Sequence, residues 1–235
     1  KLKELSGQLD IARQALDEDR SSKANLLAQT KGTEANYKKL LNASNAEEDK
    51  IQAELYNLDA GARQRAGNPT ISAKKGVLGW PMDGIMTQGY GNTGFTSLGY
   101  NFHNGIDLAA PAGKPIYAAA DGTVAHCNSS QSAYGNWCTI YHTVDTNSGA
   151  RDIVTLYAHM RSMVVSPGAN VKLGDLIGYE GNTGNTTRLL YGPDRGYHLH
   201  FTVFDRKGYT VTKGSYGNYM VPSGVTYNPL SFLGR

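Results

Sequence analysis

Apolar residues in the first 66 positions recur at alternating intervals of three and four, which is the heptad pattern of a coiled coil. These positions are Leu2, Leu5, Leu9, Ala12, Leu16, Leu26, Tyr37, Leu40, Ile51 and Leu58. The same register also includes polar residues such as Asp19, Lys23 and Glu54, so one uninterrupted two-stranded coil is not expected along the whole segment. The pattern predicts an α-helical coiled-coil arm, with a solvated helical spacer as the alternative.

Helix ends within this arm follow from two local signals. Gly32 predicts a break, and Ser44 followed by Glu47 is a capping-box pattern, in which each side chain binds a backbone N–H at the start of a helix. We therefore expect helices near residues 1–30, 33–42 and 45–60. Dimerisation, tethering and gating are the functions such an arm would serve.

From Trp80 onward, short apolar runs alternate with turn residues, a pattern typical of an antiparallel, mainly β domain. No amphipathic helix separates the runs and no phosphate-loop glycine pattern opens one, so a nucleotide-binding α/β fold is disfavoured. The predicted strand-like runs are 115–124, 137–141, 153–158, 176–179 and 198–204.

Composition changes sharply near residue 66. Residues 1–66 carry 11 basic and 11 acidic side chains with three glycines and no proline, which is typical of helices. The remaining 169 residues carry 12 basic and 9 acidic side chains, 25 glycines and all eight prolines, which is typical of turn-rich β structure. We therefore predict a helical arm at residues 1–66, a linker at 67–79 and a β domain at 80–235.

The net charge of +3 and the sequence pI near 8.7 are too mild for a nucleic-acid groove, so nucleic acid is not an expected partner. No stretch reaches the roughly 18 apolar residues that a membrane span requires, and the mean hydropathy is −0.44. The sequence begins at Lys1 inside a helix-like pattern, so an export signal or anchor preceding it is compatible with the sequence.

All six histidines of the chain lie between residues 103 and 200. His103 and Asp107 form a His-x-x-x-Asp pattern, whose side chains can reach one ion across a tight turn. His198 and His200 form a His-x-His pattern in a strand-like run, where residues two apart share a face. His159 ends the run LYAHM.

Two imidazoles, one carboxylate and an open fourth position make a catalytic zinc site, whereas a structural site is closed, usually by thiolates. Each pattern alone is a weak signal, and an ordinary strand histidine is its alternative; His126 and His142, outside the patterns, are expected to be strand or surface residues. The chain has no His-Glu-x-x-His motif, and Glu180 is the only glutamate after residue 66. A histidine is therefore expected to act as the general base.

The β domain resembles the M23 family of zinc metallopeptidases, of the lysostaphin and LytM type, from about Trp80 to Leu233. The resemblance implies the fold of a lysostaphin/LytM-like catalytic domain. The motifs that carry it, in order, are WPMDG at 80–84, HNGIDLAAPAGKPIYAAADGTV at 103–124, YGNWCTIYH at 134–142, LYAHM at 156–160, VKLGDLIGYEGNTG at 171–184, HLHF at 198–201 and YNPLSFL at 227–233.

The resemblance implies that His103, Asp107 and His200 hold one Zn²⁺ per domain and that His159 and His198 are the catalytic pair. One of the pair, assigned as His198, takes a proton from water, and His159 steadies the oxyanion; these two roles are exchangeable at the level of sequence.

The implied activity is that of a zinc metalloendopeptidase, which cleaves stem cross-links or glycine bridges of bacterial peptidoglycan. This places the protein outside the cytoplasm, in the periplasm, the cell envelope or the medium. The alternative is a binding module that activates other cell-wall hydrolases, with a regulatory partner or self-association through the arm.

Two features depart from the family pattern. The segment NTTRLLYGPDRGY, at 185–197, lengthens the loop before His198 and supplies Arg188, Tyr191, Arg195 and Tyr197 as candidates for the rim of a cleft. Cys127 and Cys138 lie at the facing ends of a predicted hairpin, where a disulfide is feasible, with two free thiols as the alternative.

Overall fold

The computed structural model describes residues 21, 23, 29–36, 39, 43, 75–94, 102–131, 133–192, 194–214 and 219–234. The chain divides into two units, Lys1–Ala46 and Glu47–Arg235. Most of the predicted arm, and the boundary between arm and linker, lie outside the described residues, so the coiled coil and the domain limits stay predictions. Among the described residues, no helix is long and apolar enough to cross a membrane.

Within the arm, residues 29–36 are helical straight through Gly32. The hydroxyl of Thr33 donates to the carbonyl of Thr30 at 2.8 Å, across the turn that contains the glycine. The expected break at Gly32 is therefore wrong. A single glycine destabilises a helix by only about 1 kcal/mol relative to alanine, and the helical residues on both sides of it can offset this cost.

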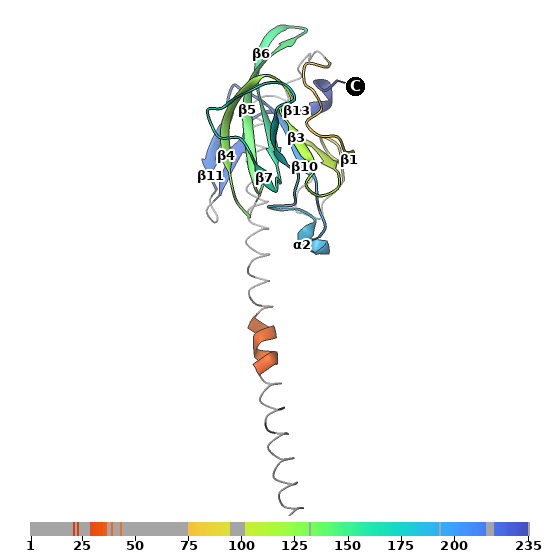
Figure 1. Ribbon diagram of the computed structural model, residues 1–235, viewed down its shortest axis with the longest axis vertical. Helices are drawn as coiled ribbons and strands as arrows, with labels where there is room; N and C mark the ends of the chain where they lie inside the picture. Colours follow the sequence, from red (N-terminus) through yellow and green to blue (C-terminus); the bar gives the residue numbers. More distant parts are fainter. Residues whose placement is uncertain are drawn as a thin grey trace, which may run out of the picture. The chain divides into compact units, whose positions relative to one another are not determined.

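Strands dominate the second unit, and every pair of named strands in its described part is antiparallel (Figure 1). The largest sheet has the order β1-β2-β10-β6-β5-β4-β8, with β13 paired to β10; a second sheet has the order β3-β9-β7, and a third pairs β11 with β12. The elements are β1 (Ile85–Gln88), β2 (Ile106–Ala109), β3 (Pro115–Tyr117), β4 (Gly122–Asn128), β5 (Trp137–Thr146), β6 (Gly149–Ala158), β7 (Ser162–Met163), β8 (Asn170–Val171), β9 (Leu176–Tyr179), α2 (Arg188–Tyr191), β10 (Leu199–Asp205), β11 (Thr210–Lys213), β12 (Met220–Ser223), β13 (Thr226–Tyr227) and the 3-10 helix η1 (Pro229–Ser231).

The mainly β, antiparallel fold expected from the sequence is thus confirmed for the described residues from 75 onward. The predicted run at 176–179 is β9, but the run at 115–124 is divided between β3 and β4. The chain leaves the ladder between them because Ala118 N–H donates to Asp175 O and Ala119 N–H donates to the hydroxyl of Tyr157.

The central strands β6 and β10 are buried on both faces, so the large sheet lies between two apolar clusters. Successive residues of a strand point to opposite faces. Phe201 and Val203 join one cluster with Tyr157, whereas Phe204 joins the other with Leu156. His200 therefore lies near the start of a strand that packs against apolar residues on both of its faces.

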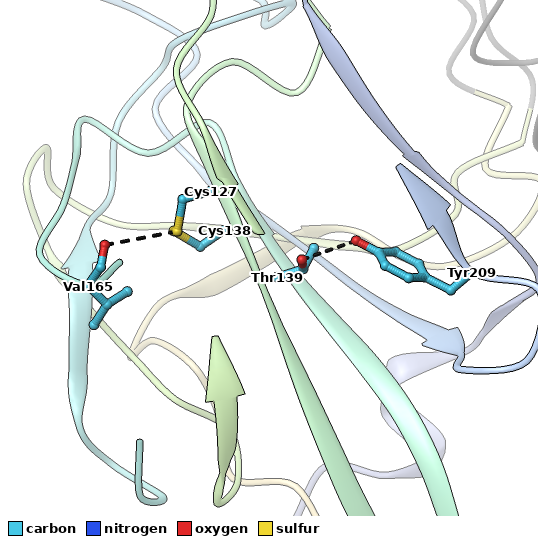
Figure 2. The surroundings of a disulfide bond; sticks show 5 residues. All are labelled: Cys127, Cys138, Thr139, Val165 and Tyr209. Carbon is cyan, nitrogen blue, oxygen red and sulfur yellow. Dashed lines mark hydrogen bonds between the residues drawn. A yellow bond between two sulfur atoms is a disulfide. The ribbon is translucent and has the colours of Figure 1, made fainter. Parts of the chain in front are cut away.

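A disulfide joins Cys127 of β4 to Cys138 of β5, which are directly paired in the ladder (Figure 2). Thr139, the next residue of β5, accepts a hydrogen bond from the hydroxyl of Tyr209 at 3.1 Å. The disulfide that the sequence left open is thus present, and it closes the base of the loop that carries Tyr134.

We predict that replacing both cysteines by serine lowers the free energy of unfolding by about 2–3 kcal/mol. The bond closes a loop with a sequence separation of 11, and its loss restores conformational freedom to the unfolded chain. Urea unfolding of the wild type and the double variant, with and without dithiothreitol, measures the difference. Equal stability of the oxidised wild type and the double variant would contradict the prediction.

Candidate metal centre

Strand register brings Asp107 and His200 together. In the antiparallel pair of β2 and β10 these two residues are directly opposite, so their side chains leave the same face of the sheet. Nδ1 of His200 lies 2.9 Å from Oδ1 of Asp107. Both side chains are buried.

His103 completes the group from the segment before β2. A bridge to Gly91 fixes its backbone, and its Nε2 lies 3.0 Å from His200 Nδ1 and 3.1 Å from Asp107 Oδ1. Three potential ligand atoms thus form a nearly equilateral triangle. The His-x-x-x-Asp and His-x-His patterns contribute to one cluster, and this is the only group of three such residues with mutually close ligand atoms in the described part of the chain.

The triangle fits one face of a zinc tetrahedron. Ligands held at about 2.0–2.1 Å from zinc in a tetrahedron are about 3.3–3.4 Å apart, close to the separations of 2.9, 3.0 and 3.1 Å in this cluster. An ion placed above the triangle would keep its fourth position open. The two nitrogens and one carboxylate oxygen are also ligand types that zinc accepts.

Contacts on the outer side of each imidazole leave the inner nitrogen unprotonated. His103 donates its Nδ1–H to Gly89 O at 2.8 Å. His200 Nε2 lies 3.1 Å from Asn104 Oδ1 and 2.9 Å from Thr202 Oγ1, so its proton is placed on Nε2. Each ring then directs a lone pair toward the centre of the triangle, as metal-ligating histidines do.

A glycine makes room for this arrangement. A Cβ atom at Gly105 would lie 2.4 Å from Phe201 O, 2.7 Å from Thr202 Oγ1 and 2.9 Å from His200 Cε1. Any larger residue at position 105 would therefore displace the ligand ring or its strand.

The charge state of the cluster suits a cation. Burial alone would raise the pKa of Asp107, but the nearby His198 and the hydrogen bonds from His103 and His200 outweigh burial and hold this pKa well below its usual value. Burial also lowers the pKa of His200 to about 4, because a charged imidazole would lose its hydration. At neutral pH Asp107 therefore carries a negative charge and the His200 ring is neutral.

His159 and His198 face each other beside this cluster, with ring centroids 4.7 Å apart. Nδ1 of His159 donates to Thr183 O at 2.7 Å, and Nδ1 of His198 donates to Gly196 O at 2.8 Å. Each ring thus keeps a bare Nε2. His198 Nε2 lies 3.8 Å from Asp107 Oδ2, which links the pair to the three-residue cluster.

The backbone at His159 has a φ of 60°, in the left-handed region that non-glycine residues rarely adopt. Two hydrogen bonds hold it there: His159 N–H donates to Tyr134 O, and Met160 N–H donates to Asn136 O, both at 2.9 Å. Burial lowers the pKa of His159 well below its usual value. The ring is thus kept neutral and aimed from the end of β6.

A close backbone approach sets the position of Thr183. Gly135 has a φ of 64°, and a Cβ atom there would lie 2.4 Å from the carbonyl carbon of Thr183. Asn136 N–H also donates to Thr183 Oγ1 at 2.9 Å. The carbonyl that orients His159 therefore depends on a glycine in a different loop.

The segment at 185–197 begins two residues after Thr183, whose carbonyl orients His159, and includes Gly196, whose carbonyl orients His198. It contains α2, whose residue Tyr191 is 70% exposed. Asn182 Nδ2 donates to Arg195 O at 2.9 Å, which ties the ends of the segment together. That the segment lines the rim of a cleft, through Arg188, Tyr191, Arg195 and Tyr197, stays a prediction.

The structure adds Asn104 and Tyr134 to the residues expected from the sequence. Asn104 Nδ2 donates to the hydroxyl of Tyr134 at 2.8 Å, and the Tyr134 ring lies 5.6 Å from that of His200. The sequence signal that could have indicated Asn104 is its position directly after His103 in HNGID. His142, by contrast, is a buried strand histidine that contacts Asp121 O and Thr155 Oγ1, as expected.

Comparison with known proteins agrees with this geometry. The sequence profile described as Peptidase family M23 matches residues 101–214, which include all five histidine and aspartate residues of the site. Residues 101–214 belong to peptidase family M23. The family expected from the sequence motifs is thereby confirmed.

Named relatives include both enzymes and an activator. The chain is 37% identical over 102 residues to the DD-carboxypeptidase/endopeptidase Mpg of Neisseria meningitidis, covering 43% of this chain and 20% of that protein. It is 38% identical over 136 residues to the uncharacterized lipoprotein YgeR of Escherichia coli, covering 58% and 48%. It is 32% identical over 126 residues to the murein hydrolase activator NlpD of Salmonella dublin, covering 54% and 30%. The chain thus spans less than half the length of each of these relatives.

Glu180 is a buried carboxyl group that lies outside the five-residue site. Its Oε2 accepts from Gly113 N–H at 3.2 Å, whereas its Oε1 is buried and has no hydrogen-bond partner in the structure. Burial raises the pKa of Glu180 to about 7, and the N–H groups of Gly113 and Ala110 only partly oppose this shift. Folded protein therefore keeps a proton that an unfolded chain releases near its ordinary pKa of 4.5.

We predict that Glu180→Gln flattens the dependence of stability on pH. Between about pH 4.5 and 7 the wild-type fold binds more protons at this site than the unfolded chain, so this group makes stability fall as pH rises. Its contribution between pH 5 and 8 is on the order of 2 kcal/mol, and the glutamine variant lacks it. Urea unfolding at pH 5 and pH 8 measures the change in each protein. Identical changes in both proteins would show that Glu180 does not titrate in this way.

Proposed function

We propose that the chain is a zinc-dependent endopeptidase that hydrolyses peptide bonds in bacterial peptidoglycan. The observation that carries the proposal is the triangle of ligand atoms from His103, Asp107 and His200, with the bare Nε2 atoms of His159 and His198 beside it. A relative named as the peptidoglycan DD-endopeptidase ShyA of Vibrio cholerae, 35% identical over 104 residues, supports the substrate class.

The three clustered residues would hold one Zn²⁺, which when bound would polarise the scissile carbonyl and make water more acidic. His198 acts as general base, accepting a proton from water at Nε2 and passing it to the leaving amine. Its positive charge in the intermediate state is stabilised by Asp107, whose Oδ2 lies 3.8 Å away.

We assign His159 to the developing oxyanion, a role that requires a proton on its Nε2, because a bare imidazole nitrogen only accepts hydrogen bonds. Since both rings present the same atom, the exchanged assignment is the alternative. In either case Thr183 O and Gly196 O orient the rings, because each accepts the Nδ1–H of one histidine.

A regulatory role is the second candidate, and the relative named as a murein hydrolase activator favours it. In that role the domain would bind peptidoglycan or another cell-wall hydrolase without cleaving peptides. The full set of five site residues favours the enzyme, because a pure binding module has no need for paired bare imidazoles next to a metal cluster.

We propose an extracytoplasmic location, in the cell envelope or the medium. The disulfide between Cys127 and Cys138 supports it, since such bonds persist in oxidising compartments. A relative named as a lipoprotein agrees with it. The arm at residues 1–66 would provide tethering, self-association or contact with a regulatory partner.

Digestion of purified peptidoglycans tests the function directly. The zinc-loaded chain is incubated with sacculi that have direct stem cross-links and with sacculi that have glycine bridges, and new termini are identified by mass spectrometry. New amino termini in either substrate support the enzyme and identify its bond. No new termini, together with increased release by an added cell-wall hydrolase, would support the activator instead.

We predict that alanine variants divide into two groups. Replacing His103, Asp107 or His200 lowers zinc occupancy well below one per chain, because each removes one of three ligands. Replacing His159 or His198 lowers turnover by at least about a hundred-fold with zinc largely retained, because the group at the oxyanion or the general base is lost. Metal analysis and hydrolysis are measured on the same preparations; loss of zinc from the His159 variant equal to that from the His103 variant would overturn the assignment.

A further inference from the structure

The outer side of the ligand His200 is held by two side chains of different chemistry. Its Nε2 lies 2.9 Å from the hydroxyl of Thr202 and 3.1 Å from the amide oxygen of Asn104. A hydroxyl both donates and accepts, so Thr202 can satisfy either tautomer of the ring. An amide oxygen only accepts, so Asn104 in this orientation requires the proton on Nε2.

The other end of the Asn104 amide contacts Tyr134. Its Nδ2 donates to the hydroxyl of Tyr134 at 2.8 Å, while Oδ1 faces His200. The Tyr134 ring also lies against the His200 ring, with a centroid separation of 5.6 Å. Asn104 therefore bridges the ligand to the side chain that covers it.

Tyr134 extends this connection to the catalytic pair. Its carbonyl accepts the N–H of His159 at 2.9 Å, at the residue whose backbone has the left-handed conformation. Hydrogen bonds thus connect His200 to Asn104, Asn104 to the side chain of Tyr134, and the backbone of Tyr134 to His159.

We propose that Asn104 is a positioning residue, which fixes His200 as an Nδ1 ligand and joins the metal cluster to the loop that holds His159. The proposal rests on the proposed zinc site. It assigns to Asn104 a role in metal affinity that Thr202 alone does not fulfil. It also assigns to the hydroxyl of Tyr134 a role in keeping that amide in place.

Zinc affinity of the full chain, measured by competition with a chromophoric chelator at fixed pH, tests the proposal. Asn104→Ala is expected to weaken zinc binding about ten-fold to a hundred-fold, the usual cost of losing a partner of a ligating histidine. Asn104→Asp is expected to bind within a few-fold of the wild type, because a carboxylate also accepts from Nε2.

A double-mutant cycle with Tyr134→Phe separates positioning from general destabilisation. If Tyr134 acts through Asn104, the double variant binds zinc no more weakly than Asn104→Ala alone. Nitrogen-15 spectra of the zinc-loaded proteins give a second readout, in which the proton of His200 stays on Nε2 in the wild type and in Asn104→Asp.

Asn228→Ala is the matched control, because this asparagine caps η1 through Leu230 N–H and contacts no residue of the cluster in the structure. It is expected to lower stability and leave zinc affinity of the folded protein unchanged. Zinc affinity of Asn104→Ala equal to that of the wild type, or additive effects in the cycle, would overturn the proposal. If the wild type binds zinc but releases no peptides from peptidoglycan, the proposed function fails while this comparison of affinities still stands.

Discussion

Three electron-pair donors within about 3 Å of one another repel unless a positive charge lies between them. The atoms are Nε2 of His103, Nδ1 of His200 and Oδ1 of Asp107, and burial prevents water from separating them. Much of the surrounding structure opposes this repulsion. The register of two central strands, a bridge at Gly91 and the absence of a side chain at Gly105 all hold the donors in place.

The same principle extends to the neighbouring imidazoles. At each of the four rings of the site, an oxygen accepts the proton of the outer nitrogen and leaves the inner nitrogen bare. Three of these oxygens are backbone carbonyls, at Gly89, Thr183 and Gly196. The arrangement of lone pairs is therefore a property of loop conformation more than of side-chain identity, and His200, with its side-chain partners, is the exception.

The sequence predicted the antiparallel fold and the residues that meet at the site because both leave local signals. Alternating apolar runs give the strands, and the short spacings in HNGID and HLHF give pairs that share a face. The backbone carbonyls left no such signal, since any residue type supplies one. Gly32 shows the opposite error: a local helix breaker was outweighed by the helix that continues on both sides of it. The connection through Asn104 required the tertiary structure, because it joins segments that are 30 residues apart.

The disulfide between β4 and β5 has a consequence for motion at the edge of the sheet. Among the described residues, only the two-residue strand β8 lies on the outer side of β4, so fraying would begin there. The covalent link lies at the base of the loop between β4 and β5, which carries Tyr134 and Gly135. Separation of β4 from β5 therefore cannot pass Cys127 while the disulfide is intact, so the two ends of the loop that carries Tyr134 stay joined.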